Sequence, residues 1–248
     1  MRAEFTIPHS GKIPRVAARV HRADAPFLSR IPGSVLYTAG RTRVLCTAII
    51  EEGVPPFLLG KEKGWATAEY DLLPGSTVPR HARERNGKLS GRTQEIQRLI
   101  GRAIRASLDL TALTGLTLKL DCDVIEADGG TRTASVNGAW IATALAVADR
   151  MKTGVPLRSP ILRQVGAISV GLVRGDYLLD LDYDEDSRAD VDLTVAMDDD
   201  GKLIEVQGTA EGQPFEPEDL ARMIAMARTT LDGIFKLQRE AVAGANRS

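Results

Sequence analysis

The chain has 248 residues, 43% hydrophobic and 26% charged, with a net charge of −1 that argues against a general nucleic-acid binder. No stretch reaches the roughly 18 apolar residues of a membrane span, and residues 1–22 lack the apolar run of a signal peptide. Cys46 and Cys122 lie in apolar, strand-like segments, so we expect two buried, reduced thiols in a cytoplasmic protein. The three histidines are scattered, which argues against a zinc cluster.

In chain order, the first half contains weakly periodic residues followed by clear strand and helix patterns. Apolar alternation and helical periodicity predict strands at 35–39, 43–51 and 66–73, a loop at 74–91, a helix at 93–108, a strand at 116–125, a turn at 128–130 and a helix at 131–151. Residues 1–30 show no clear period.

In the second half, the same patterns predict mainly strands, at 164–173, 177–183, 191–197 and 203–210. A last helix begins near Pro217, and its apolar face is Leu220, Ile224, Ala227, Leu231 and Ile234. We therefore expect an α+β fold, in which two packed α/β halves with mixed sheets and helices form a single domain over residues 1–248.

Although the net charge of the chain is near zero, two of its segments carry strong and opposite charges. Residues 80–105 carry eight basic residues and two acidic ones, whereas residues 176–200 carry ten Asp and one Glu against one Arg. On the predicted helix at 93–108, Arg98, Arg102 and Arg105 form a basic stripe. A basic segment can hold phosphates, and an acidic one can hold a divalent metal.

Two helix entries combine glycine, threonine and arginine. Gly129-Gly130-Thr131-Arg132-Thr133 joins a strand to a helix, and Ser90-Gly91-Arg92-Thr93 opens the basic helix. Glycine lets the backbone approach an anion, helix starts expose N–H groups, and arginine suits phosphate oxygens. Taken alone, the first entry could be either an anion site or a tight turn, and the second is better explained as a solvated loop arginine. Two such entries in one chain favour a site where both bind the same anion.

The run Leu179–Leu193 carries aspartates at alternating positions. As a strand it would present Asp180, Asp182, Asp184 and Asp186 on one face, followed by Asp190 and Asp192. Carboxylates this close repel one another unless a cation or a shared proton intervenes, and Mg²⁺ or Mn²⁺ prefers such oxygen ligands. We therefore favour metal or proton chemistry over a merely solvent-facing acidic strand.

Loop arginines precede the basic helix. Arg80, Arg83, Arg85 and Lys88 could clamp an RNA backbone or simply be solvated. Aromatic residues make up only 4% of the chain, so a broad base-stacking platform is not evident.

Five stretches, at 64–74, 90–110, 121–139, 179–197 and 204–215, resemble the ribonuclease PH family in order and spacing. The resemblance implies a ribonuclease PH-like fold and a phosphate-dependent 3′-to-5′ exoribonuclease. Such an enzyme cleaves the terminal linkage of transfer-RNA precursors reversibly, releases nucleoside diphosphates, also serves ribosomal-RNA processing, and assembles as a homohexamer built from three dimers. Its cofactor would be Mg²⁺ or Mn²⁺, inorganic phosphate its co-substrate and RNA its partner, with neither DNA nor a membrane involved.

The resemblance also assigns roles to particular residues. Arg92 and Gly130-Thr131-Arg132 fall where the family binds phosphate, and Arg80 and Arg83 where it holds RNA. Asp186 and Asp192 match catalytic and metal-linked carboxylates, with Asp184 and Asp190 as close alternatives. One carboxylic acid, or a water on the metal, would protonate the departing 3′ oxygen.

Three positions depart from the resembled pattern. Gly75 stands where Arg is usual, Arg41 where Asp or Asn is usual, and Glu126 where Gln is usual. They bear on the grip on RNA rather than on the phosphate site. A non-catalytic RNA-binding ring subunit and a metal-dependent hydrolase that uses water remain the alternatives.

Overall fold

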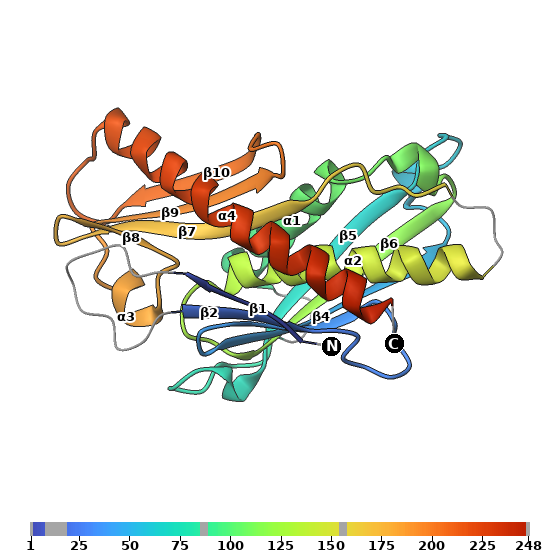
Figure 1. Ribbon diagram of the computed structural model, residues 1–248, viewed down its shortest axis with the longest axis horizontal. Coiled ribbons are helices and arrows are strands. Elements are labelled where there is room, and N and C mark those ends of the chain that lie inside the picture. The colour runs from blue at the N-terminus through green and yellow to red at the C-terminus, as the bar shows by residue number, and fades with distance from the viewer. Residues whose placement is uncertain (1, 8–18, 85–88, 154–157, 247–248) are drawn as a thin grey trace.

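The computed structural model describes residues 2–7, 19–84, 89–153 and 158–246 (Figure 1). The elements in chain order are β1 (Arg2–Ile7), β2 (Arg19–Asp24), β3 (Ser34–Ala39), β4 (Thr42–Glu52), η1 (Pro56–Leu58), β5 (Trp65–Leu72), η2 (Pro74–Ser76), α1 (Gly91–Ala106), η3 (Leu110–Leu113), β6 (Leu116–Glu126), α2 (Thr131–Lys152), β7 (Val165–Val173), β8 (Asp176–Leu179), α3 (Tyr183–Asp186), β9 (Val191–Asp198), β10 (Leu203–Ala210) and α4 (Pro217–Ala245).

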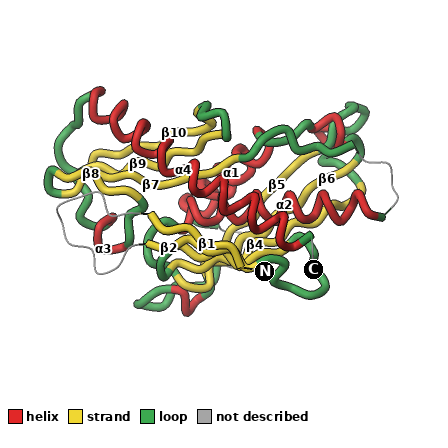
Figure 2. The backbone as a smooth tube through the Cα atoms, in the orientation of Figure 1, coloured by secondary structure: helices red, strands yellow, loops and turns green. Residues whose placement is uncertain are grey.

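The strands form two sheets. The first has the order β1-β2-β3-β4-β6-β5, and its pairs are antiparallel except β5 and β6, which run parallel. The second has the order β10-β9-β7-β8 and is antiparallel. Helices α2 and α4 lie across one face of the first sheet, and α4 continues over the second (Figures 1 and 2). The predicted α+β fold of two packed halves is confirmed.

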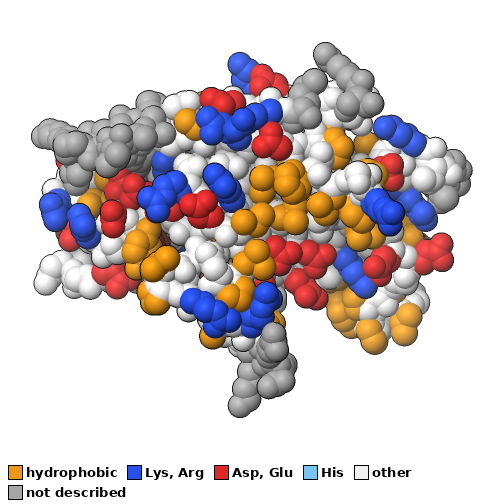
Figure 3. Space-filling view, turned by 90° about the horizontal axis from the view of Figure 1, so that it is seen from below, with side chains coloured by type: hydrophobic (Ala, Val, Ile, Leu, Met, Phe, Trp, Pro, Cys, Tyr) orange, Lys and Arg blue, Asp and Glu red, His pale blue; other side chains and the backbone are white. Residues whose placement is uncertain are grey.

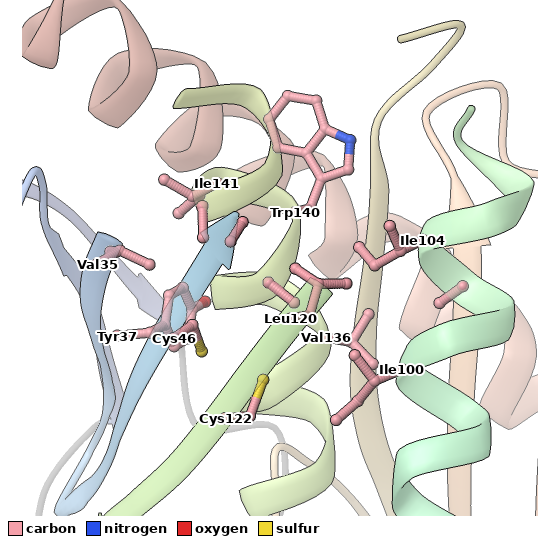
Figure 4. Close-up of a cluster of buried hydrophobic side chains, with 14 of the residues drawn as sticks. Val35, Tyr37, Cys46, Ile100, Ile104, Leu120, Cys122, Val136, Trp140 and Ile141 are labelled. Carbon is pink, nitrogen blue, oxygen red and sulfur yellow. The ribbon is translucent and has the colours of Figure 1, made fainter. Parts of the chain in front are cut away.

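Helix α2 is the centre of the larger core, and its residues from Thr133 to Val147 are all buried. Figure 4 shows β3 and β4 on one side of α2 and α1 on the other. Gly138 permits this contact, because a Cβ at that position would lie 2.6 Å from the Cys46 Sγ. Cys46 and Cys122 are directly paired across β4 and β6, and both are buried as predicted. Packing on all sides holds the start of α2 in place.

A smaller core lies between the second sheet and α4. On α4 the expected apolar face is confirmed, since Ala227, Leu231 and Ile234 are buried and Leu220 and Ile224 are half-buried. None of the helices in the described parts of the chain combines the length and apolar character needed to cross a lipid bilayer.

Two strands escaped the sequence analysis, because β1 and β2 lie in the segment without a clear period. In β2 the inward positions are Arg19, His21 and Ala23, so two polar side chains occupy core positions and hide the alternation.

The strand predicted at 177–183 is present but ends four residues early. β8 ends at Leu179, Asp180 adopts a positive φ of 55°, and residues 183–186 form the short helix α3. The aspartates of this run therefore do not share one strand face. On the face shown in Figure 3, acidic and basic side chains are interspersed.

Candidate active site

The N-terminal ends of α1 and α2 form the first part of the candidate site. The Ser90 hydroxyl caps α1 by accepting a hydrogen bond from the Thr93 N–H at 3.1 Å. α2 begins after Gly130, which has a left-handed φ of 62°. The first N–H groups of a helix have no partner within the helix and carry partial positive charge. Both helix starts are therefore suited to an anion.

Arg92 and Arg132 stand at the second position of these two helices and act on the same neighbours. Burial raises the pKa of the Tyr70 hydroxyl, and the charges of both arginines oppose that rise. The two guanidinium groups also act together on Asp186 and Asp192. The fold thus brings together two arginines that are 40 positions apart in the sequence.

The turn formed by residues 128–130 is held rigidly. A Cβ at Gly129 would lie 2.6 Å from the Leu181 carbonyl oxygen, so only glycine lets the turn pack against the segment that enters α3. The Thr42 hydroxyl donates to the Gly129 carbonyl at 2.6 Å and accepts from the Asp128 N–H at 2.8 Å. This tight turn carries Gly130, Thr131 and Arg132 into the site.

Tyr70, near the C-terminal end of β5, is a site residue that the sequence analysis missed. Its hydroxyl lies 2.9 Å from the Thr131 Oγ1, and the side chain is almost fully buried. The contact fixes the threonine at the start of α2. The strand pattern around Tyr70 indicated only a core aromatic, so the local sequence held no signal for this role.

Asp186 and Asp192 form the carboxylate side of the site. Asp186 ends α3 and Asp192 is half-buried in β9. Burial, followed by the neighbouring charge of Asp186, raises the pKa of Asp192 to about 6. Loss of hydration raises the pKa of Asp186 too, while Arg132 and Arg92 oppose the rise. Glu211, just after β10, adds a further negative charge that acts on both aspartates.

The neighbouring aspartates have other contacts. Asp182 caps α3 by accepting from the Glu185 N–H at 2.9 Å. Asp190 accepts from the Arg174 N–H at 3.0 Å in the β7–β8 turn, and Asp184 is exposed. Among the residues weighed from the sequence, Asp186 and Asp192 are the pair whose pKa values the charges of Arg132 and Arg92 lower.

A divalent cation fits this carboxylate pair in part. Within residues 2–7, 19–84, 89–153 and 158–246, no three His, Cys, Asp or Glu side chains are grouped as a metal site. The two carboxylates nevertheless supply hard oxygen donors. Burial, and after it the negative charge of Asp186, raises the pKa of Asp192, and a cation would relieve the charge repulsion. Asp186 and Asp192 could therefore hold Mg²⁺ or Mn²⁺ only together with water or substrate oxygens.

The expected basic stripe of α1 is mostly paired within the protein. Arg102 makes a two-pronged ion pair with Glu205 of β10, at 2.6 and 2.5 Å. Arg105 donates to the Ala66 carbonyl at 2.8 Å, and its guanidinium lies 4.5 Å from the Trp65 ring centre. These two arginines of the stripe therefore stabilise the packing of α1 against its neighbours.

A polar chain from the same ion pair reaches Arg132. Gln207 donates to Glu205 at 2.8 Å, and the Arg132 guanidinium lies 3.5 Å from the Gln207 Oε1 and 3.6 Å from the Glu95 carboxylate. These longer contacts orient Arg132 from both sides. They leave most of its five N–H donors for an anion.

The loop before α1 carries Arg80 and Arg83, and both are exposed. Glu84 ties this loop to the helix start, since its carboxylate accepts from the Ser90 N–H at 2.9 Å and from the Thr93 hydroxyl at 3.0 Å. Arg85 and Lys88, which the sequence leaves open as RNA contacts or solvated residues, lie outside the described residues.

A buried cluster of charged residues lies next to the site and connects the segments that form it. The Arg19 Nε lies 2.9 Å from the Asp180 carboxylate, and its Nη1 donates to the carbonyls of Asp128 and Leu181. His21 lies 2.9 Å from the same carboxylate. Arg19 and Asp180 are 3% and 0% exposed, so this ion pair joins β2, the 128–130 turn and the acidic segment inside the protein. Sequence analysis assigned no role to Arg19 or His21.

Two family models match the chain: domain 1 of the 3′ exoribonuclease family over residues 19–149, and domain 2 of the same family over residues 163–230. The chain belongs to this family, which is the ribonuclease PH family. In this 3′ exoribonuclease family member, the arginines lie in domain 1 and the two aspartates in domain 2, so both domains build the site.

Solved structures share the fold of this 3′ exoribonuclease family member. The Archaeoglobus fulgidus exosome with RNA bound to the active site matches at a TM-score of 0.71 and 21% identity, covering 88% of this chain and 86% of that one. Rice (Oryza sativa) Rrp46 matches at 0.67 and 18%, covering 89% and 93%, and an archaeal exosome core at 0.66 and 20%, covering 88% and 83%.

The three departures from the resembled pattern come together in this family member. Arg41, Gly75 and Glu126 are far apart in the sequence, yet all three line one groove of about 390 Å³ beside the 128–130 turn. We expected these three residues to lie apart from the phosphate-binding residues, and their place in the groove agrees with that.

Proposed function

We propose that the protein is a phosphorolytic 3′-to-5′ exoribonuclease that trims transfer-RNA precursors and releases nucleoside diphosphates. One observation carries the proposal: two arginines at two helix starts face a pair of carboxylates whose pKa values are raised. Anion-binding groups opposite an acid whose pKa is raised to about 6 are suited to phosphoryl transfer to inorganic phosphate.

In the proposed reaction, Arg92, Arg132 and the N–H groups of residues 130–132 hold inorganic phosphate. A phosphate oxygen attacks the last phosphodiester, the bond from phosphorus to the 3′ oxygen of the preceding nucleotide breaks, and the terminal nucleotide leaves as a diphosphate. The protonated carboxyl of Asp192 gives its proton to the departing 3′ oxygen. Asp186 raises the proton affinity of Asp192.

Asp186 and Asp192 would hold a divalent cation, Mg²⁺ or Mn²⁺, in their ionised forms. That cation would neutralise charge on the transferring phosphoryl group and take over the role of the Asp192 proton. The chain's own arginines supply the rest of that neutralisation. The reaction exchanges a phosphodiester for a diphosphate, so it is expected to run in both directions.

We further propose a cytoplasmic homohexamer, a trimer of dimers, in which Arg80 and Arg83 hold the RNA backbone. The support is their exposure on a loop that Glu84 anchors to the phosphate side of the site. Among the described residues of the loop before α1, Arg80 and Arg83 are the exposed arginines.

The deciding experiment incubates a short RNA with the protein and Mg²⁺, with and without inorganic phosphate. Nucleoside diphosphates formed only with phosphate are the expected result. Monophosphates formed without phosphate would identify a hydrolase. RNA binding without any product would identify a binding subunit of a larger ring.

A further inference from the structure

The groove beside the 128–130 turn has the size and place of a ligand subsite. Its volume of about 390 Å³ is within the range of small-molecule sites. Four separate segments line it: the β3–β4 turn at Arg41, the loop at 75–78, the end of β6 at 125–128, and Tyr183 at the start of α3. These segments come from both domains, so the groove forms only when the two domains pack together.

The groove borders the proposed reaction site on two sides. Asp128, in its wall, is followed directly by Gly129 and Gly130, which lead into α2. Tyr183 is three residues from Asp186 on α3, a spacing that places two side chains on neighbouring positions of one helix face. A nucleotide bound at the phosphate site therefore has this groove within its reach.

The Ser76 hydroxyl indicates that the groove takes a polar ligand. Ser76 lines the groove and is 4% exposed, yet its Oγ has no hydrogen-bond partner in the part of the chain that the structure describes. A buried hydroxyl without a partner costs stability and is rare in folded proteins. A ligand atom in the groove would supply the missing bond.

The other lining groups indicate which ligand this is. Tyr183 is 65% exposed and offers an aromatic face, on which a nucleobase can stack. Glu126 contributes a carboxylate, which only accepts hydrogen bonds. Guanine presents two adjacent N–H donors on its Watson–Crick edge, whereas the other bases present at least one acceptor beside their donor. A carboxylate in a base pocket therefore selects guanine over the other three bases.

We propose that this groove, named here the Tyr183 groove, is a nucleobase subsite that favours guanine in the RNA strand. Tyr183 stacks on the base, Glu126 accepts from its N1–H and amino group, and Ser76 pairs with a remaining polar atom of the nucleotide. The inference deepens the proposed function, because it gives the exoribonuclease a preference for particular 3′ ends.

The test measures binding rather than turnover. Four sets of short RNAs carry G, A, C or U at each of the last three positions in turn, and binding is measured with EDTA and without phosphate. 5′-GMP and 5′-AMP are titrated in parallel. The expected result is at least about fivefold tighter binding of G at one position and of GMP over AMP, a difference of roughly 1 kcal/mol.

Three variants and one control connect that preference to the groove. Glu126→Gln should abolish the preference for G, and Tyr183→Ala should weaken binding of all four bases. Gly75→Phe adds a bulky ring to the groove wall, where a Cβ meets no atom within 4 Å, and should weaken binding of all four bases. Glu52→Gln removes an exposed carboxylate elsewhere and should change nothing.

Equal affinities for the four bases in the unmodified protein would overturn the proposal, as would a preference for G that survives Glu126→Gln. The arms also separate this inference from the proposed function. Selective binding of GMP without RNA cleavage would support the groove and refute the exoribonuclease. Phosphate-dependent cleavage without any base preference would do the reverse.

Discussion

Replacing Asp192 by asparagine tests the electrostatics of the site without any RNA. Burial and the charge of Asp186 raise the pKa of Asp192 from 3.8 to about 6. The folded protein therefore binds this proton more tightly than the unfolded chain does. The stability that the protonated acid contributes is fully present below a pH of about 4 and is lost as the pH rises through about 6.

The size of the effect follows from the two pKa values. Each pKa unit corresponds to about 1.4 kcal/mol, so the full loss of unfolding free energy is ~3 kcal/mol. Between about pH 5 and about pH 7.5, roughly 1.4 kcal/mol of that loss occurs. The amide that Asp192→Asn introduces cannot ionise and should keep this stability. The variant is therefore expected to gain ~1.4 kcal/mol relative to the unmodified protein across this interval.

The assay is urea unfolding of both proteins at the two pH values, in EDTA and without phosphate, so that no ligand contributes. Asp184→Asn is the matched control, since it removes an exposed carboxylate from α3. A difference between Asp192→Asn and the unmodified protein that is the same at both pH values would refute the reasoning. In activity assays the same variant should lose at least about tenfold in turnover in both directions, ~1.4 kcal/mol in the barrier.

Further substitutions test the rest of the site. Arg132→Ala should reduce nucleoside diphosphate release at saturating phosphate by roughly 100-fold or more while the circular dichroism spectrum stays unchanged, because a charge-assisted contact to the attacking phosphate is lost; a near-normal rate would contradict its role. Arg80→Ala with Arg83→Ala should weaken processing of transfer-RNA precursors more than cleavage of short RNA, with the larger salt dependence on the long substrate, and equal losses would argue against an RNA grip. Arg19→Met should lower the unfolding free energy by ~3 kcal/mol in chemical denaturation, because it leaves the Asp180 carboxylate buried beside His21 without its arginine. Adding Asp180→Asn should restore part of that loss. An Arg19→Met protein as stable as the parent would refute the stabilising role of the buried ion pair.

Local signals in the sequence determined much of the site. The paired glycines before Thr131 and the Ser90 cap before α1 each act within a few residues, so the starts of both helices were predictable together with Arg92 and Arg132. Helices α1, α2 and α4 were also predictable, because regular burial of one face or of the whole helix leaves a period in the sequence.

The acidic segment was not predictable in the same way. Alternating aspartates read as one strand face, but the chain turns at Asp180, buries that carboxylate against Arg19, and continues as α3. The partner that decides this is 161 positions away in the sequence, on β2. A pattern with period two describes only the local backbone and contains no information about so distant a charge.

Only the tertiary structure decided which charges face the candidate site. Arg102 and Arg92 lie on the same helix and look alike in the sequence, yet Arg102 is paired with Glu205 while Arg92 faces the carboxylates of domain 2. Tyr70 also joins the site only through the tertiary structure, because its hydroxyl contacts Thr131 across the core. Long-range packing selects the partners of each polar group, because every buried charge or hydroxyl must find one wherever the fold provides it.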